Sequence, residues 1–368
     1  MSVYYFIISI SLFFAFLNID KRIVNSKKDI FVAASIVSLI LIIIASIRYE
    51  TGYDLNLYKI IFENTPTFYE LISKKNNPPM EFELGYTSLY IFTKSIFNSF
   101  QFQLLVFSIL SITLLQNITL KQSPYPLMSI FLYICFFYFF MIMGQMRQGL
   151  SIIILYYSYQ YILKNNFKKF ILIVCIASLF HLSSLIFLPS YFLVRKKYKI
   201  KQLFLIFIFT FIFTFFLIDY VILFFQGLYF KNPSNFLYYK IYVYSVHYVG
   251  DFSPMAYYEK IILGLVIILL YHNKNINQKI PNYHVISNIM LLGIIIYMCL
   301  IQTFTVIGAR GANNFLSFSI FIYPMFLKSV KNVNYKYLIF LLIMIYPLVR
   351  CLMKLSTEYS YFPFKTFF

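Results

Sequence analysis

The sequence predicts an all-α integral membrane protein with about ten transmembrane helices, and two observations lead to that prediction. First, the 368-residue chain is 61% hydrophobic and 22% aromatic but only 12% charged, whereas ordinary soluble domains contain about 25% charged residues. Second, its long apolar runs alternate with short basic or polar patches, at intervals that suit the roughly 20 helical residues needed to cross a bilayer. We therefore expect one polytopic membrane domain over residues 1–368, without soluble appendages.

Ten apolar runs are the predicted spans. They are residues 3–17, 30–47, 102–119, 125–143, 147–163, 202–219, 258–271, 285–306, 312–327 and 337–353. The first run has no basic region before it and no small-residue cleavage site, and Lys21 and Arg22 follow it. These features predict an uncleaved span with the N-terminus outside.

The apolar segment 84–97 is ambiguous, and loop charges decide how we interpret it. With residues 20–29 inside, residues 48–83 form a large outer loop. If 84–97 then crossed the membrane, the basic patch around Lys168 would face outward, against the positive-inside bias. A helix of 14 residues is also only about 21 Å long. We expect an interfacial helix on the outer side.

The second ambiguous segment, 170–193, has basic clusters on both sides, KNNFKK before it and RKKYKIK after it. A single crossing cannot place both clusters on one face, whereas a re-entrant helical hairpin can. His181 lies near the middle of this hairpin. The remaining basic loops then fall inside, and residues 220–257 form the second large periplasmic loop.

The net charge of +19 is also explained by the basic loops. Lys and Arg gather in short loops between apolar runs, so they indicate orientation, and nucleic acid is not an expected partner. The four cysteines have no paired spacing and lie in apolar runs, which argues against a disulfide framework or a metal site.

Four groups of polar residues converge on the predicted outer side. They are Arg48, Asp54 and Tyr58 in RYETGYDLNLY, Arg147 and Gln148 in GQMRQ, His181 in SLFHLSS, and Arg310 in GARGANN. Ionisable groups at membrane depth are functional candidates by default. Each group also has a structural interpretation: an Arg at the end of a span can be an interfacial anchor, a lone His a hydrogen-bond partner, and paired glycines a tight turn.

Several cations around one outer cavity suit an anionic ligand. The planar guanidinium matches phosphate oxygens, and a lipid diphosphate is the obvious membrane-borne anion with a long apolar tail. Acids of the same outer loop, Asp54, Glu81 and Glu83, are candidates to accept a proton from an attacking hydroxyl. The Glu81 and Glu83 pair is nevertheless better explained as part of a solvated loop, and no convincing metal constellation is present.

At these same residues the sequence resembles the EpsG/Wzy-type family of membrane polysaccharide polymerases, which includes O-antigen polymerases. The similarity rests on RYETGYDLNLY at 48–58, MRQGLS at 146–151 and SLFHLSSLIFLPSYFL at 178–193, with a weaker match in GARGANNFLSFSIFIYP at 308–324.

The resemblance implies a glycosyltransferase of the bacterial inner membrane with its active site facing the periplasm. Its substrate is an undecaprenyl-diphosphate-linked oligosaccharide, and a growing chain moves from its lipid diphosphate to the next lipid-linked repeat unit. Asp54 or His181 is the expected catalytic base. Arg48, Tyr58, Arg147, Gln148 and Arg310 are the expected substrate-binding residues. No cofactor or metal is required, membrane lipid is a partner, and a chain-length regulator protein is a plausible one.

Other classes of protein share part of this pattern. A lipid-linked oligosaccharide flippase also needs cations facing a cavity, but its charges should run through the central helices to both faces. An O-antigen ligase would share the donor and the chemistry. A membrane acyltransferase would need a histidine-bearing basic pocket on the cytoplasmic side, which the sequence does not suggest.

Overall fold

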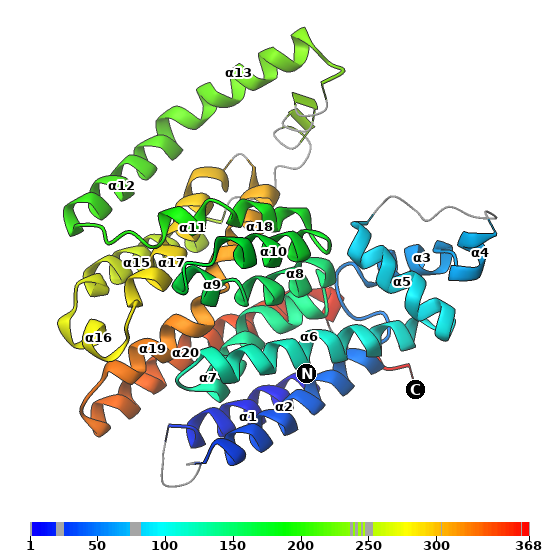
Figure 1. The fold of residues 1–368 in the computed structure, drawn as a ribbon, viewed down its shortest axis with the longest axis horizontal. Helices are drawn as coiled ribbons and strands as arrows, with labels where there is room; N and C mark the ends of the chain where they lie inside the picture. The colour runs from blue at the N-terminus through cyan, green and yellow to red at the C-terminus, as the bar shows by residue number, and fades with distance from the viewer. Residues whose placement is uncertain are drawn as a thin grey trace. The chain divides into compact units, whose positions relative to one another are not determined.

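The computed structural model describes residues 2–19, 26–73, 82–235, 238–239, 242–243, 246, 253–302, 304–361 and 363–367. Their regular elements are helices, and the described residues contain no β-strand beyond one isolated bridge (Figure 1). The all-α prediction is confirmed. The chain forms two compact units, Met1–Leu185 with Ser319–Phe368, and Ile186–Phe318.

The first unit contains most of the N-terminal helices and the last two. Its elements are α1 (Ser2–Leu17), α2 (Lys27–Ile47), α3 (Leu55–Asn64), α4 (Phe68–Ile72), α5 (Leu84–Ile96), α6 (Phe100–Gln122), α7 (Pro126–Tyr133), the π-helix η1 (Ile134–Ile142), α8 (Met146–Tyr156), α9 (Tyr159–Leu163), α10 (Phe167–Ser178), α19 (Ser319–Ser329), α20 (Val333–Thr357) and the 3-10 turn η4 (Tyr359–Tyr361).

The second unit begins within the 3-10 segment η2 (Leu182–Phe187). It then contains α11 (Ser190–Leu193), α12 (Ile200–Ile212), the π-helical segment η3 (Phe213–Leu217), α13 (Ile218–Lys231), α15 (Pro254–Tyr271), α16 (Lys274–Lys279), α17 (Tyr283–Leu300) and α18 (Thr305–Leu316).

The α2 helix shows how local sequence and packing combine in the first unit. It begins at a capping box, in which Ser26 Oγ accepts from Asp29 N–H at 3.0 Å and Asp29 Oδ2 accepts from Ser26 N–H at 3.2 Å. One face then buries small residues such as Ala34 and Ala45. The α6 helix is its main neighbour, and α1 lies alongside it (Figure 1).

The helix that precedes the GQMRQ turn changes its winding midway. Pro126 occupies the first turn of α7, where a missing N–H costs nothing. The chain continues as the π-helix η1, a type of segment that is often found at functional sites. Tyr138 in η1 donates to Leu41 O at 2.6 Å, which ties the segment to α2. The chain then turns at Met143–Gln145 and starts α8, which carries Arg147.

Among the residues that the structure describes, six helices are long and apolar enough to cross a membrane. They are Lys27–Ile47, Phe100–Gln122, Ile200–Lys231, Pro254–Tyr271, Tyr283–Leu300 and Val333–Thr357. Each coincides with one of the ten predicted spans, which supports a multi-pass membrane protein. The count of about ten itself stays a prediction.

The remaining predicted spans are shorter or interrupted helices. Segment 147–163 is broken at Tyr157–Ser158, between α8 and α9, and segment 312–327 is broken at Ser317–Phe318, between α18 and α19. An 11-residue helix such as α8 is only about 17 Å long, whereas a bilayer core is about 30 Å thick.

Both ambiguous segments are helical in part. The predicted interfacial helix 84–97 corresponds to α5. In 170–193, α10 ends at Ser178, and His181 lies at the break before the 3-10 turn η2. The interrupted helix expected there is present, while the placement of both segments in a membrane stays a prediction.

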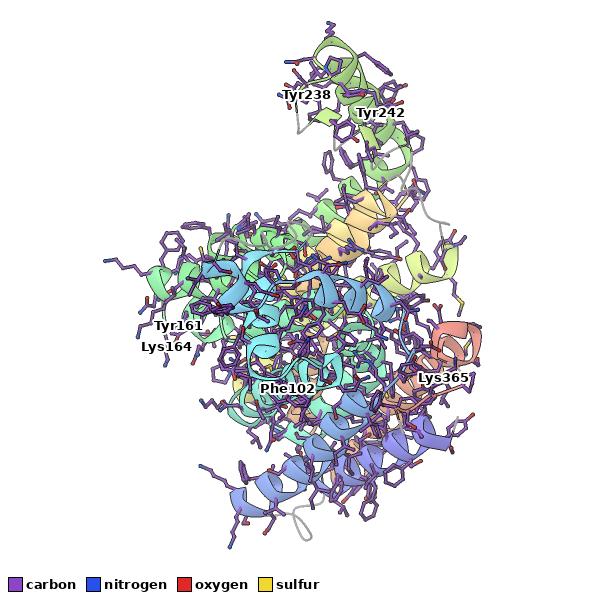
Figure 2. All side chains as sticks on the ribbon, turned by 90° about the vertical axis from the view of Figure 1, so that its right-hand side faces the viewer. Phe102, Tyr161, Lys164, Tyr238, Tyr242 and Lys365 are labelled. Carbon is purple, nitrogen blue, oxygen red and sulfur yellow. The ribbon has the colours of Figure 1, made fainter. Side chains whose placement is uncertain are left out.

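The start of segment 220–257 differs from the expected loop. Helix α13 continues to Lys231, because the run of apolar residues extends through Phe225. Near the end of α13, Tyr229 stacks on Tyr242 with ring centroids 4.5 Å apart. Figure 2 shows Tyr238 and Tyr242 at this end of the helix.

Candidate functional site

A cluster of ionisable side chains in the first unit joins three predicted loop and turn regions. Glu83 Oε2 lies 2.6 Å from Arg147 Nη1, and Glu83 Oε1 lies 3.1 Å from His181 Nδ1. The three side chains retain only 12%, 22% and 13% of their surface, in the order Glu83, Arg147 and His181. Glu83 is therefore the common partner of two residues singled out from the sequence.

The backbone around Glu83 is docked onto the end of α10. Gly85 N–H donates to Leu179 O at 2.8 Å, and Leu182 N–H donates to Glu83 Oε1 at 3.2 Å. A Cβ on Gly85 would lie 2.8 Å from Leu179 O and 2.9 Å from Leu179 Cβ. Only glycine permits this approach, which brings Glu83 within reach of His181.

Arg147 is held on several sides. Its guanidinium lies over the ring of Phe82, 4.1 Å from the centroid. Tyr58 is buried beside it, with its ring 5.3 Å from that of Phe82. Burial raises the pKa of Tyr58, while the charge of Arg147 and a hydrogen bond from it act in the opposite direction. The structure thus brings Tyr58 and Arg147 together.

Glu83 is ionised at neutral pH. Burial alone would raise the pKa of its carboxyl, but the hydrogen bond with His181 and the charge of Arg147 outweigh burial and lower the pKa to about 2. The carboxylate can therefore orient His181 as well as pair with Arg147.

His181 has one ring nitrogen engaged and one available. Nδ1 faces Glu83, whereas Nε2 is buried and has no hydrogen-bond partner among the described residues. A carboxylate on Nδ1 favours the tautomer with a proton there, which leaves the Nε2 lone pair to accept a proton. This is the arrangement that a general base needs.

Arg48 lies behind the start of α8 and has no exposed surface. Its Nη2 lies 3.4 Å from Ile142 O and 3.3 Å from Met146 Sδ. Its Nε and Nη1 have no hydrogen-bond partner within the part of the chain that the structure describes. A buried guanidinium with unmatched donors is costly, and such residues are characteristic of functional sites.

The C-terminal segment holds the Arg48 loop in place. Tyr49 N–H donates to Lys365 O at 2.9 Å, Phe367 N–H to Ile47 O at 3.0 Å, and Gly52 N–H to Ser360 O at 2.8 Å. The Lys365 ammonium, labelled in Figure 2, also pairs with Glu50 at 2.8 Å. This contact between residues 47–52 and 360–367 has no signal in the local sequence.

Gly52 fits the Arg48 loop against the turn before α8. Its φ of +126° is a backbone conformation that residues with a side chain adopt only under strain. A Cβ at this position would also lie 2.1 Å from Met143 O. We expect Gly52→Ala to lose roughly 1–3 kcal/mol to backbone strain, with further loss from overpacking. The thermal unfolding midpoint of the purified protein in detergent should fall clearly.

Gly227→Ala is the matched control, because nothing lies within 4 Å of a Cβ at that position in α13. Alanine favours a helix over glycine by about 1 kcal/mol, so this midpoint should be unchanged or slightly higher. Equal midpoints for the two variants would contradict the packing role of Gly52.

The other predicted residues are placed as follows. Asp54 is half-buried at the N-terminal end of α3, where its backbone O accepts from Tyr58 N–H at 3.0 Å. Gln148 is buried in the first turn of α8. Arg310 is half-buried in α18, in the second compact unit.

The GARGANN stretch is part of a helix and does not form the loop expected between two spans. Helix α18 runs through it and ends only at Leu316, with Ser317 as its C-cap. A Cβ on Gly308 would lie 2.9 Å from Leu300 Cβ and 3.0 Å from Leu300 C. The glycine therefore serves the close packing of α18 against α17, which pattern alone does not distinguish from a turn.

Glu83 is the residue that sequence reasoning undervalued. The solvated-loop interpretation fails for it, because its side chain is largely buried and doubly paired, while Glu81 lies outside the described residues. The sequence signal for Glu83 was an acidic residue directly before an apolar helix, in a loop predicted on the same outer side as Arg147 and His181. Among the described residues there is no group of three or more His, Cys, Asp and Glu side chains placed to hold a metal.

The long apolar helices and the buried charged cluster define a multi-pass membrane protein with a polar site assembled from loops and helix ends. The chain belongs to the EpsG family, whose model matches residues 31–366. Membership supports a polysaccharide-polymerase-like enzyme in general. No curated protein and no solved structure matches the chain.

Proposed function

We propose that this protein is a polymerase of O-antigen or a similar surface polysaccharide. It transfers a growing glycan from polyprenyl diphosphate to the next lipid-linked repeat unit, at the periplasmic side of the bacterial inner membrane. The observation that carries the proposal is the cluster in which Glu83 joins Arg147 to His181. The Glu83 carboxylate thereby contacts both an anion-binding group, Arg147, and a proton acceptor, His181.

The donor diphosphate binds at the start of α8. Arg147 lies in the first turn of this 11-residue helix, where the helix dipole also favours an anion. Arg48 is buried behind Met146 and adds positive charge in a setting of low dielectric. Both charges stabilise the diphosphate as it leaves. Arg310 is proposed as a further cation for the substrate.

The acceptor hydroxyl is deprotonated by His181. The bond between C1 of the donor sugar and the diphosphate oxygen breaks, and the electron pair leaves with the diphosphate. The acceptor oxygen bonds to C1, and its proton passes to His181 Nε2. We favour His181 over Asp54 as the base because Glu83 orients its ring. The lipid diphosphate is already an activated leaving group, so these steps use no metal or cofactor.

Deleting the protein in its native host and restoring it tests the proposal. We expect the ladder of surface polysaccharide on a gel to collapse to core plus one repeat unit, and the wild-type chain to restore it. Unused lipid-linked polymer would instead indicate a ligase. An unchanged ladder would refute polymerase activity and favour a transporter.

A further inference from the structure

The second compact unit contains an apolar cavity whose lining includes none of the candidate site residues. Its volume is about 180 Å³, and its lining comes mainly from α12, α15 and α17, including Leu203, Phe207, Ile268 and Leu291. Leu193 and Ile206 also line it and keep 43% and 40% of their surface exposed. The cavity therefore has an apolar wall that remains accessible from outside the unit.

A strongly basic segment borders this cavity. Tyr198, one of its lining residues, lies within RKKYKIK at 195–201, which contains five cations in seven residues. Lys196, Lys197, Lys199 and Lys201 are exposed, and none of the four forms an ion pair with a described acidic residue. Helix α12 starts at Ile200, so its N-terminal dipole adds to the positive potential.

Hydrogen bonds fix the basic segment to the helices that line the cavity. Asn288 Nδ2, on α17, donates to Val194 O at 2.8 Å and to Lys196 O at 2.9 Å. Tyr198 N–H donates to the hydroxyl of Tyr271, on α15, at 3.3 Å. The backbone of the basic segment is thus anchored to the helices that line the cavity, and the two form one structural feature.

We infer that this feature binds an anionic phospholipid, with an acyl chain in the cavity and the phosphate over Lys197, Lys199 and Lys201. An apolar slot joined to unpaired cations complements a molecule with a hydrocarbon chain and a negative headgroup. Positive-inside bias places this segment at the cytoplasmic surface, where anionic phospholipids are abundant. The inference is independent of the proposed polymerase chemistry.

The test measures phospholipid binding to the purified full-length chain in detergent by native mass spectrometry. Phosphatidylglycerol and phosphatidylcholine with identical acyl chains are the probes, and wild type should bind the former more tightly. At about 1 kcal/mol per lysine near an anionic surface, the triple variant Lys197→Gln, Lys199→Gln and Lys201→Gln should bind phosphatidylglycerol about a hundredfold more weakly.

The matched control removes the same charge elsewhere. Lys164, Lys168 and Lys169 form another exposed basic patch, and they do not line the cavity. Their replacement by glutamine should leave phosphatidylglycerol binding unchanged. If both triple variants lose affinity equally, the binding is diffuse surface attraction and the site is refuted.

Two further measurements test the tail and the occupant. Ile206→Trp should fill the cavity and weaken binding at least tenfold, so retained affinity would refute the tail site. Equal binding of phosphatidylglycerol and phosphatidylcholine to wild type would also refute the inference, without any variant. Stronger binding of a polyprenyl diphosphate that depends on the same three lysines would show that the occupant is an isoprenoid donor.

Discussion

Arg147→Ala should end chain extension, leaving single repeat units where wild type makes a ladder. The variant removes the guanidinium that contacts Glu83, Tyr58 and the face of Phe82. Loss of one preorganised donor to a developing anion costs about 10²–10³-fold in rate. The measurement is polymer length and amount in the deletion host, normalised to the amount of protein in the membrane.

Two companion variants separate the role of Arg147 from general damage. Arg147→Lys keeps the charge but loses the planar fork, so it should fall between wild type and alanine. Arg350→Ala removes an exposed arginine, on α20, whose guanidinium lies 5.8 Å from the ring centroid of Phe136, and should polymerise normally. A full ladder from Arg147→Ala at normal protein levels would rule out the diphosphate role.

His181→Ala should lower the rate of polymerisation by about 10²–10⁴-fold, the usual contribution of a general base. Glu83→Gln should cause a smaller loss, because an amide oxygen still accepts from His181 but the negative charge is gone. The double variant should be no slower than His181→Ala alone, if Glu83 acts through His181. Initial rates with purified lipid-linked repeat units provide the measurement.

An exposed acid supplies the control for Glu83. Glu63 on α3 lies 3.9 Å from Lys59, and both side chains are exposed, a setting in which such pairs contribute little. Glu63→Gln should therefore retain the wild-type rate. Fully additive losses in the Glu83 and His181 double variant would show that Glu83 acts mainly through Arg147. A wild-type rate in His181→Ala would rule out His181 as the base and make Asp54 the preferred one.

The low pKa of Glu83 sets the pH range over which its charge contributes. Because folding lowers the pKa from its ordinary 4.5 to about 2, the stabilisation is complete above about pH 4.5 and is lost as pH falls towards 2. Rates measured near neutral pH thus compare a fully charged Glu83 with a neutral glutamine. Any difference in the free energy of unfolding between wild type and Glu83→Gln should disappear in strong acid.

The sequence by itself determined the class of protein and most of the candidate residues. Apolar runs of the right length specify helices for a membrane, and six of them form long helices at the expected positions. The turn before Arg147 and the helix break at His181 also follow from local signals, since polar residues and small residues interrupt apolar periodicity there.

Tertiary structure decided which of these residues meet. Glu83 lies 64 positions from Arg147 and 98 from His181, and the C-terminal segment reaches Glu50 across 315 positions. Hydropathy reports the environment of each residue but not its partner, because pairing depends on how the helices pack. Close approaches at Gly52 and Gly85 set that packing, and a single sequence does not distinguish such glycines from those of an ordinary turn.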